Sequence, residues 1–434
     1  MRITGKTASD IFESIRLLAQ SGQLLPGESL PPVRDLAGML DVNRNTVASA
    51  YKRLVTAGIA VTQGRLGTAI RRQEAPGEQE GVMLDSPLVD LASGNPNPAW
   101  LPDVTTAWAQ RPYRPRMYGE KPVNPELEAH GRHWFSNDCP NQFEIDLAHG
   151  AVDAIERLLS AHLVAGDKVA VEDPCFLSSF NTLRLAGFQS LGVAVDAEGL
   201  RADALEAALA LGAQAVIVTP RAHNPTGWGL SRSRAHDLRA LLERYPHVQV
   251  IVDDHFALLA EAPYWNVIPS TAQRWAVIRS VSKALGPDLR LAMVASDPQT
   301  SQRLRLRLAP GTSWVSHLLQ DIVGNCLMAP EMAEQLSRAR QDYARRRCAL
   351  AEALSAEGIA CATPTDGLNL WIPLQQDGQA VASLLARYGW LVRGGEVFGI
   401  RAPARGLRIT VSTLEEAQAK RFAIDLKHVL AGPR

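Results

Sequence analysis

The sequence predicts a small domain of three helices and a two-stranded β wing over residues 1–72, followed by a large α/β domain over residues 89–434. Three observations predict this division. Apolar residues recur at helical spacing three times before residue 58, and a stretch dense in Pro, Gly and Glu then covers residues 73–88. Beyond it, short continuous apolar runs alternate with helix-like segments, which is typical of a buried parallel sheet. A chain of 434 residues, 46% of them hydrophobic, is long enough for more than one domain.

Composition argues against a membrane or secreted protein. No apolar run approaches the roughly 18 residues that span a bilayer, and the first residues, MRITGKTASDIFES, contain no apolar signal segment. The five cysteines are scattered and never spaced as Cys-x-x-Cys, so we expect neither a disulfide framework nor a metal site. We therefore expect a cytoplasmic, nucleoid-associated protein with no membrane partner.

The formal net charge of zero conceals an asymmetry. Residues 1–72 contain ten Lys and Arg against five Asp and Glu, which gives +5 and leaves −5 for the rest of the chain. A small basic domain before a large acidic one favours an anionic partner for the first.

The first two predicted helices lie before residue 41. The apolar face of the first helix is formed by Ile11, Ile15, Leu18 and Ala19, and Gly22 ends it. Pro31 and Pro32 set the start of the second helix. Its apolar residues recur at i, i+3, i+4 and i+7, namely Val33, Leu36, Ala37 and Leu40.

A third helix is predicted over NRNTVASAYKRLVTAG, with Asn43 as its N-cap and Gly58 just beyond its end. We expect a buried stripe made of Val47, Ala50, Tyr51, Leu54 and Val55. The first turns then project the side chains that a recognition helix presents to base edges, Arg44, Asn45, Thr46 and Ser49. The following AVTQGRLGTAI predicts two strands around a Gly-rich turn, a wing with Arg65 near the DNA phosphates.

This string of residues resembles the winged-helix domain of GntR-type bacterial regulators. The resemblance runs through SGQLLPGESLPPVRDLAGMLDVNRNTVASAYKRLVTAGIAVTQGRLGT and covers nearly all of residues 1–72. It implies binding to a double-stranded DNA operator through Arg34, Arg44, Asn45, Thr46 and Gly67. One departure is Pro32–Val33, where the family commonly carries small hydroxyl residues that contact a phosphate.

The large domain begins after the predicted linker, QEAPGEQEGVMLDSPL at 73–88. Four apolar runs predict buried parallel strands: KVAVED (168–173), AQAVIVTP (213–220), VQVIVDD (248–254) and WAVIRSVS (275–282). From about Ala329, helix-forming sequence followed by GLNLWIPL and GLRITVS predicts a second α+β lobe.

A single lysine, Lys283, directly follows the last of these strands. An amine at the carboxyl end of a parallel strand can form a Schiff base with an aldehyde when its surroundings lower its pKa. Pyridoxal phosphate (PLP) is an aldehyde cofactor that also needs hydroxyls and an arginine for its phosphate, and Arg290 lies seven residues later. An ordinary loop lysine is the alternative for this segment taken alone.

Other segments supply the remaining groups in order. VQVIVDDHF ends a strand in two carboxylates, and we assign Asp253 to the pyridinium nitrogen, with Asp254 capping or solvated. HNPTG offers Asn224 to the phenolic oxygen, and EDPCF places Phe176 where an aromatic ring could stack. The amides of Ala151 and Val152 begin a helix that could receive phosphate. GLRIT contributes Arg408, which suits a carboxylate.

This constellation resembles the fold-type I, aspartate-aminotransferase-like PLP enzymes over roughly residues 89–434. The resemblance implies a Schiff base (aldimine) at Lys283, phosphate contacts from Ser280, Ser282 and Arg290, and Gly94 on the substrate side. It also implies that Tyr118 reaches the phosphate of a partner subunit, hence a homodimer. Two residues depart from the family pattern. Phe256 replaces the tyrosine of D-x-x-Y, and Phe176 stands where tyrosine is common.

A GntR-type winged helix fused to an aminotransferase-like domain resembles the MocR-type regulators, and within them a member linked to vitamin B6 metabolism. The implied function is a PLP-responsive transcriptional regulator, with PLP or a small amino compound as effector and the enzyme-like domain used as a sensor. Two alternatives remain open: an active aminotransferase tethered to DNA, and a regulator whose degenerate pocket binds no cofactor.

Overall fold

The structure is a computed structural model that describes residues 3–62, 64, 67–70, 80–81, 86–109, 114–140, 142–363 and 365–432. The chain forms two compact units, Met1–Gly77 and Glu78–Arg434. Within the described residues, no helix is long and apolar enough to cross a membrane.

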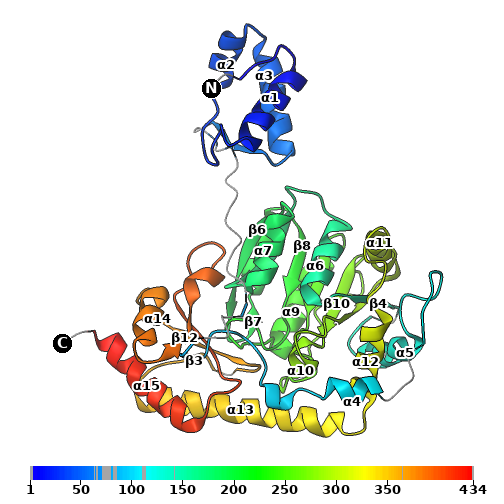
Figure 1. The fold of residues 1–434 in the computed structure, drawn as a ribbon, viewed down its shortest axis with the longest axis vertical. Coiled ribbons are helices and arrows are strands. Elements are labelled where there is room, and N and C mark those ends of the chain that lie inside the picture. The colour runs from blue at the N-terminus through cyan, green and yellow to red at the C-terminus, as the bar shows by residue number, and fades with distance from the viewer. Residues whose placement is uncertain are drawn as a thin grey trace. The chain divides into compact units, whose positions relative to one another are not determined.

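The small unit contains three helices and a β wing, as predicted (Figure 1). The helices are α1 (Ala8–Gln20), α2 (Val33–Leu40) and α3 (Arg44–Thr56), and strands β1 (Ala60–Thr62) and β2 (Thr68–Ile70) pair antiparallel. Their common core includes Ile11, Ile15, Leu36, Val47 and Leu54. A first helix of 13 residues is marginal alone, so this shared core supplies most of its stability.

Local signals set the limits of α3. The Asn43 side chain accepts a hydrogen bond from the Asn45 amide at 2.8 Å, which confirms the predicted N-cap, and Gly58 adopts a positive φ of 69° beyond the last turn. The prediction of Val55 as buried was wrong, because its side chain is 37% exposed. Val55 lies eight positions after Val47, and the buried stripe of α3 ends at Leu54.

The large unit is built on an eight-stranded sheet of order β4-β11-β10-β9-β8-β5-β6-β7. The strands from β10 to β6 pair parallel, whereas β11 runs antiparallel to both neighbours and β7 antiparallel to β6. In sheet order the strands are β4 (Glu144–Ala148), β11 (Ala292–Ser296), β10 (Trp275–Ser280), β9 (Gln249–Asp253), β8 (Ala213–Val218), β5 (Lys168–Asp173), β6 (Gln189–Asp196) and β7 (Gly199–Leu200). The four predicted runs correspond to β5, β8, β9 and β10.

Both faces of this sheet are buried, which explains why its strands are continuously apolar. Alternate residues enter different cores: Val250 and Val252 belong to one cluster, and Ile251 belongs to the other. Helices cover both faces (Figure 1). The helices before and around the sheet are α4 (Val104–Ala109), α5 (Pro125–Phe135), α6 (Ala151–Ser160), α7 (Leu177–Leu185), α8 (Ala202–Ala210), α9 (Arg232–Glu243), α10 (Ser282–Leu285), α11 (Pro298–Leu308) and α12 (His317–Met328).

A C-terminal lobe, drawn in orange and red in Figure 1, completes the large unit. Helix α13 (Met332–Ala356) leads into a three-stranded sheet of order β12-β15-β14, made of β12 (Asn369–Pro373), β15 (Gly406–Thr410) and β14 (Arg393–Gly394). Helices α14 (Gly378–Ala386) and α15 (Glu416–Ala431) pack on it. Strand β3 (Val89–Asp90) pairs parallel with β13 (Trp390–Leu391), so the segment that enters the large unit is tied to this lobe. The predicted second α+β lobe is therefore present.

Candidate functional site

The polar residues predicted to form a site lie along one edge of the eight-stranded sheet. Asp253 ends β9 and pairs with Ile278 of the neighbouring β10, which ends two residues later at Ser280. Ser280 pairs with Ala292 of β11, and Ala292 pairs with Ala148 at the end of β4. Because these residues lie within two residues of one another along the sheet, the loops that follow β4, β9 and β10 leave the sheet at the same edge.

Lys283 lies in α10, three residues after β10 ends. Its ammonium nitrogen donates a hydrogen bond to the carbonyl oxygen of Gly94 at 2.6 Å. Burial lowers the pKa of Lys283 to about 8, Glu80 opposes this shift, and Arg408 adds to it. The neutral fraction of the amine near neutral pH is therefore much larger than that of an ordinary lysine, as a nucleophilic lysine requires.

Arg408 projects from β15 and is fully buried. Its guanidinium donates to the Ala92 carbonyl oxygen at 2.5 Å and to Asn224 Oδ1 at 3.1 Å, and it stacks over the Phe398 ring at 5.2 Å. The remaining partner is the carboxylate of Glu80. Arg408 and Asn224 thus form one polar cluster, with Gly94 beside the arginine.

Asp253 is buried at the end of β9. Burial raises the pKa of its carboxyl, and His255, whose Nδ1 lies 3.8 Å from Asp253 Oδ1, partly opposes that shift. Among the described residues, no hydrogen-bond donor reaches Asp253 Oδ1. Burial also raises the pKa of nearby Glu172 to about 8, so this second carboxyl is mostly neutral at pH 7 and adds little negative charge beside Asp253.

The start of α6 forms an anion-binding corner. Gly150 is the N-cap with a φ of 94° and supplies no side-chain cap, so Ala151 and Val152 begin the helix with backbone amides free of capping. A Cβ at Gly150 would lie 3.1 Å from Arg290 Nη2, and Arg290 donates to the His149 carbonyl oxygen at 3.4 Å. A helix N-terminus beside an arginine suits a phosphate.

Three further predicted residues flank this edge. The hydroxyl of Ser280 donates to Ser282 Oγ at 3.1 Å and accepts from the Ser282 amide at 3.2 Å. The two serines are therefore hydrogen-bonded to each other at the end of β10, directly before Lys283. Phe176 is half-buried at the start of α7, three residues after β5 ends. Its ring follows a strand end on the same sheet edge, as predicted.

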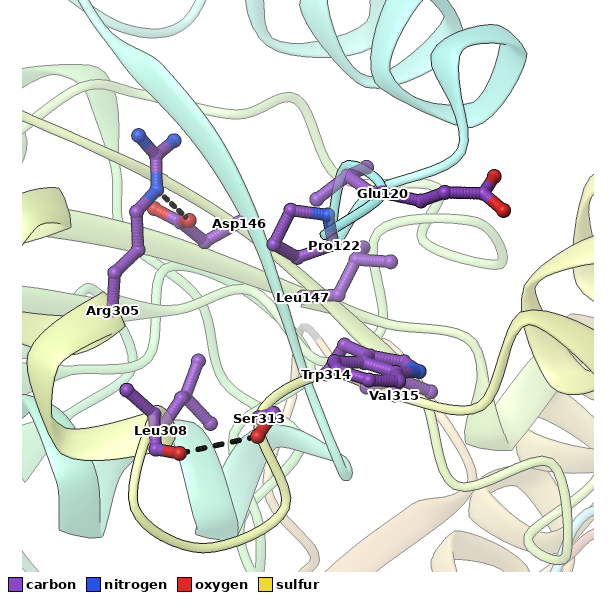
Figure 2. Close-up of a pocket in the computed structure, with 11 residues that line it drawn as sticks. Glu120, Pro122, Asp146, Leu147, Arg305, Leu308, Ser313, Trp314 and Val315 are labelled. Atoms are coloured by element: carbon purple, nitrogen blue, oxygen red, sulfur yellow. Dashed lines mark hydrogen bonds and ion pairs between the residues drawn. The ribbon is translucent and has the colours of Figure 1, made fainter. Parts of the chain in front are cut away.

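Tyr118 is not brought to the site of its own chain. Its side chain is 92% exposed, and its ring contacts Trp314 edge-on at 5.6 Å. Trp314 also lines a hollow of about 320 Å³ that contains none of the predicted cofactor residues. Figure 2 shows this hollow, with Arg305 directed at Asp146 and with Pro122 and Leu147 opposite Trp314.

The predicted DNA-reading residues share the exposed side of the small unit's second and third helices. Arg44, Asn45 and Ser49 are exposed on α3 and Thr46 is half-buried. Arg34 is exposed on α2, where it pairs with its neighbour Asp35, at 3.3 Å. Gly67 has a φ of 89° in the turn of the wing, directly before β2. Arg65 lies outside the described residues.

Sequence reasoning missed two site residues and misplaced a third. Glu80 was counted as linker, and His255 was noted only as part of the changed D-x-x-Y pattern. Asp254 was expected to be capping or solvated, which is wrong: it is fully buried and accepts from Arg221 at 2.8 and 3.0 Å and from Arg279 at 3.0 Å. The second acid of VDDHF points to the opposite side of the strand from Asp253, where two buried arginines balance its charge.

Comparison with known proteins identifies both units. Residues 86–426 match the family described as aminotransferase class I and II, and residues 7–70 match bacterial regulatory proteins of the gntR family. The chain therefore belongs to the aminotransferase class I and II family and carries a GntR-family domain in front of it. Both resemblances drawn from the sequence, and the predicted fold class, are confirmed.

Particular relatives show the same combination. The chain is 55% identical over 428 residues, 99% of both chains, to the vitamin B6 salvage pathway transcriptional repressor PtsJ of Salmonella typhimurium. It is 25% identical over 363 residues to the pyridoxine biosynthesis transcriptional regulator PdxR of Corynebacterium glutamicum, 80% of this chain and 78% of that one. The solved structure of the α-aminoadipate aminotransferase LysN from Thermus thermophilus matches with a TM-score of 0.70 and 21% identity, over 80% of this chain and 92% of LysN.

Pyridoxal phosphate is the cofactor of this family, and the residues of the site fit it. A buried amine with a lowered pKa, the unpartnered oxygen of Asp253 and the corner formed by Gly150 and Arg290 match an aldehyde, a ring nitrogen and a phosphate. When bound, the cofactor supplies an aldehyde carbon and an electron-accepting ring.

The lowered pKa of Lys283 predicts how its reactivity depends on pH. In the protein without cofactor, trace labelling by acetic anhydride should rise with pH around a midpoint of about 8, because only the neutral amine reacts and burial favours it. Lys420, whose pKa Glu416 raises, is the internal control and should label only at higher pH. Labelling of each lysine is read by peptide mass spectrometry. A Lys283 midpoint at the ordinary value of 10.5 would contradict the prediction.

Proposed function

We propose that this protein is a PLP-responsive transcriptional regulator of vitamin B6 metabolism genes, acting in the cytoplasm on a double-stranded DNA operator. The observation that carries the proposal is the presence, in one chain, of an exposed recognition helix and a buried lysine site, together with 55% identity over 99% of both chains to the Salmonella repressor. The large unit serves as the sensor, and PLP or a small amino compound is its effector.

The residues of the large unit divide the work of holding PLP. Lys283 holds the aldehyde end, Asp253 the ring nitrogen, and Asn224 the phenolic oxygen, while Phe176 stacks on the ring. The phosphate is held by Ala151, Val152, Ser280, Ser282 and Arg290. Arg408, with Gly94 beside it, holds the carboxylate of an amino compound. His255 lies close to Asp253 and partly opposes the rise in the pKa of its carboxyl that burial causes.

The test measures DNA affinity as a function of PLP. An operator is selected from a random duplex library, and binding is followed by fluorescence anisotropy across the range in which PLP binds. We expect the affinity to change with PLP because a switch requires unequal affinity of the effector for two states. Lys283→Ala should abolish both borohydride-stable retention of PLP and the DNA response, while the control Lys420→Ala keeps both. DNA affinity that stays constant throughout the titration would refute the proposal.

Arg44 is the residue that we expect to read a base. Arg44→Ala should weaken operator binding by about 1–3 kcal/mol, because an arginine bidentate to guanine contributes on that order. The loss should be largest for the selected operator and smaller for random duplex. Arg387→Ala, which removes an exposed arginine from the large unit, is the matched control. Equal losses of DNA affinity in the two variants would show that Arg44 is a solvated cation that reads no base.

We propose a homodimer in which Tyr118 of each subunit reaches the partner's phosphate site. Its side chain is 92% exposed and its ring contacts Trp314, which supports this arrangement. The full chain should sediment as a dimer, and Tyr118→Phe should weaken PLP retention by removing the hydroxyl without removing the contact with Trp314. A full chain that sediments as a monomer, with PLP bound, would contradict the proposal.

A second candidate, an active aminotransferase tethered to DNA, is favoured by one observation: a buried lysine and a buried arginine suited to a carboxylate share one site. A freed Lys283 amine could move the α-proton of a bound amino acid. Steady release of keto acid from an amino acid by the PLP-loaded protein would establish this activity. If no keto acid is released although amino compounds bind, the sensor role remains and the aminotransferase candidate is refuted.

A further inference from the structure

Glu80 occupies the position on Arg408 where an amino compound would place its carboxylate. Arg408 Nη1 donates to Glu80 Oε1 at 2.5 Å, and Nη2 donates to Oε2 at 2.8 Å. This two-bond, parallel geometry is how a guanidinium binds any carboxylate. Asn224 Nδ2 adds a third bond, to Glu80 Oε1 at 3.2 Å. The two terminal nitrogens of Arg408 are therefore already engaged by a carboxylate of its own chain.

The surroundings are shaped to hold this glutamate. A Cβ at Gly94 would lie only 2.8 Å from Glu80 Oε2, so the absence of a side chain at residue 94 leaves room for the carboxylate. The next residue, Gly81, donates its amide to the Ser93 carbonyl oxygen at 3.1 Å and accepts from Arg393 Nη2 at 3.0 Å. Backbone and side chain are thus fixed together at Glu80 and Gly81.

Charge explains why this contact forms. Burial alone would favour the neutral acid, but Arg408, with Lys283 and Arg393, lowers the pKa of Glu80 below its ordinary value. Glu80 in return keeps a fully buried guanidinium from standing without a counter-charge, a situation that costs several kcal/mol. The fork of Arg408 accommodates one carboxylate, so a ligand carboxylate and Glu80 exclude each other.

Glu80 also lies close to the start of the large unit along the chain. The large unit begins at Glu78, and the wing strand β2 of the small unit ends only ten residues before Glu80. A change at Glu80 is therefore a change in the first residues of the connection to the DNA-binding unit. Few residues of the large unit are so near to the small unit along the chain.

We propose that Glu80 is an internal ligand of Arg408, and that an amino compound bearing a carboxylate displaces it and releases the Glu80–Gly81 segment. The inference names the class of the effector. It rests on the proposed function in one respect, namely that release of this segment changes DNA binding. The ligand's free carboxylate, rather than its amine alone, is then the group that displaces Glu80 from Arg408 and releases the segment.

The test compares L-alanine with L-alaninamide, which differ only in the carboxylate, on the full-length PLP-loaded protein without DNA. Binding is followed by the cofactor's absorbance. Glu80→Gln should bind L-alanine at least about tenfold more tightly than wild type. In wild type, Glu80 occupies Arg408 most of the time and lowers the apparent affinity for a ligand carboxylate, and removing this competitor restores the intrinsic affinity. Affinity for L-alaninamide should change little. Glu78→Gln removes the same charge two residues earlier and should behave as wild type.

Equal L-alanine affinities in wild type and Glu80→Gln would overturn the inference, as would equal gains for L-alanine and L-alaninamide. A measurement on wild type covers the case in which the variant folds poorly. L-alanine should accelerate hydrogen exchange at the Gly81 amide, whose bond to Ser93 the displacement releases, and L-alaninamide should not. Unchanged exchange at saturating L-alanine would equally refute displacement.

These readouts separate the inference from the proposed function. If DNA affinity ignores PLP but Glu80→Gln still tightens L-alanine binding, the regulator proposal fails and the internal ligand stands. If DNA affinity responds to PLP while neither L-alanine affinity nor Gly81 exchange depends on Glu80, the regulator stands and the internal ligand fails.

Discussion

The parallel pairing of β8, β9 and β10, with both faces of the sheet buried, is the constraint on which the site depends. A strand buried on both faces has no place for a polar side chain except at its ends or beside a counter-charge. Asp253 and Ser280 are accordingly found where their strands end, and Lys283 follows in the next turn. Asp254, just past the end of β9, is tolerated because Arg221 and Arg279 neutralise it.

Charge balance then decides which groups of the site are ready to react. Burial penalises every ion in this region, so each one either has a partner or becomes neutral. Glu172 is mostly neutral at pH 7, and burial lowers the pKa of Lys283 to about 8, whereas Arg408 is held by the carboxylate of Glu80. The amine thus lies in surroundings that disfavour its charge, while the guanidinium has a carboxylate in direct contact.

Much of this arrangement could be predicted from the sequence, because strand ends follow from apolar runs and the residues just after them share an edge. That reasoning places Lys283, Asp253, Asn224 and Arg290 at one edge of the sheet, and their roles toward a cofactor stay a prediction. It failed where a contact joins segments far apart in the chain. Glu80 meets Arg408 across 328 positions, and a Glu in a stretch rich in Pro and Gly has no local pattern that distinguishes it from solvated linker. Val55 failed for a geometric reason, since the end of a helical stripe drifts away from the core.

A link between the carboxylate site and the linker has a thermodynamic consequence that does not depend on the route of the signal. Any ligand that favours the released form of Glu80 is itself favoured by whatever else stabilises that form. If a DNA-bound head draws the linker away from Arg408, DNA strengthens binding of carboxylate ligands by the same factor by which those ligands strengthen DNA binding. If DNA binding instead requires the held linker, the two oppose each other equally. Under the proposed displacement, the sign of the coupling between ligand and DNA is therefore set by which form of the Glu80–Arg408 ion pair the operator complex accepts.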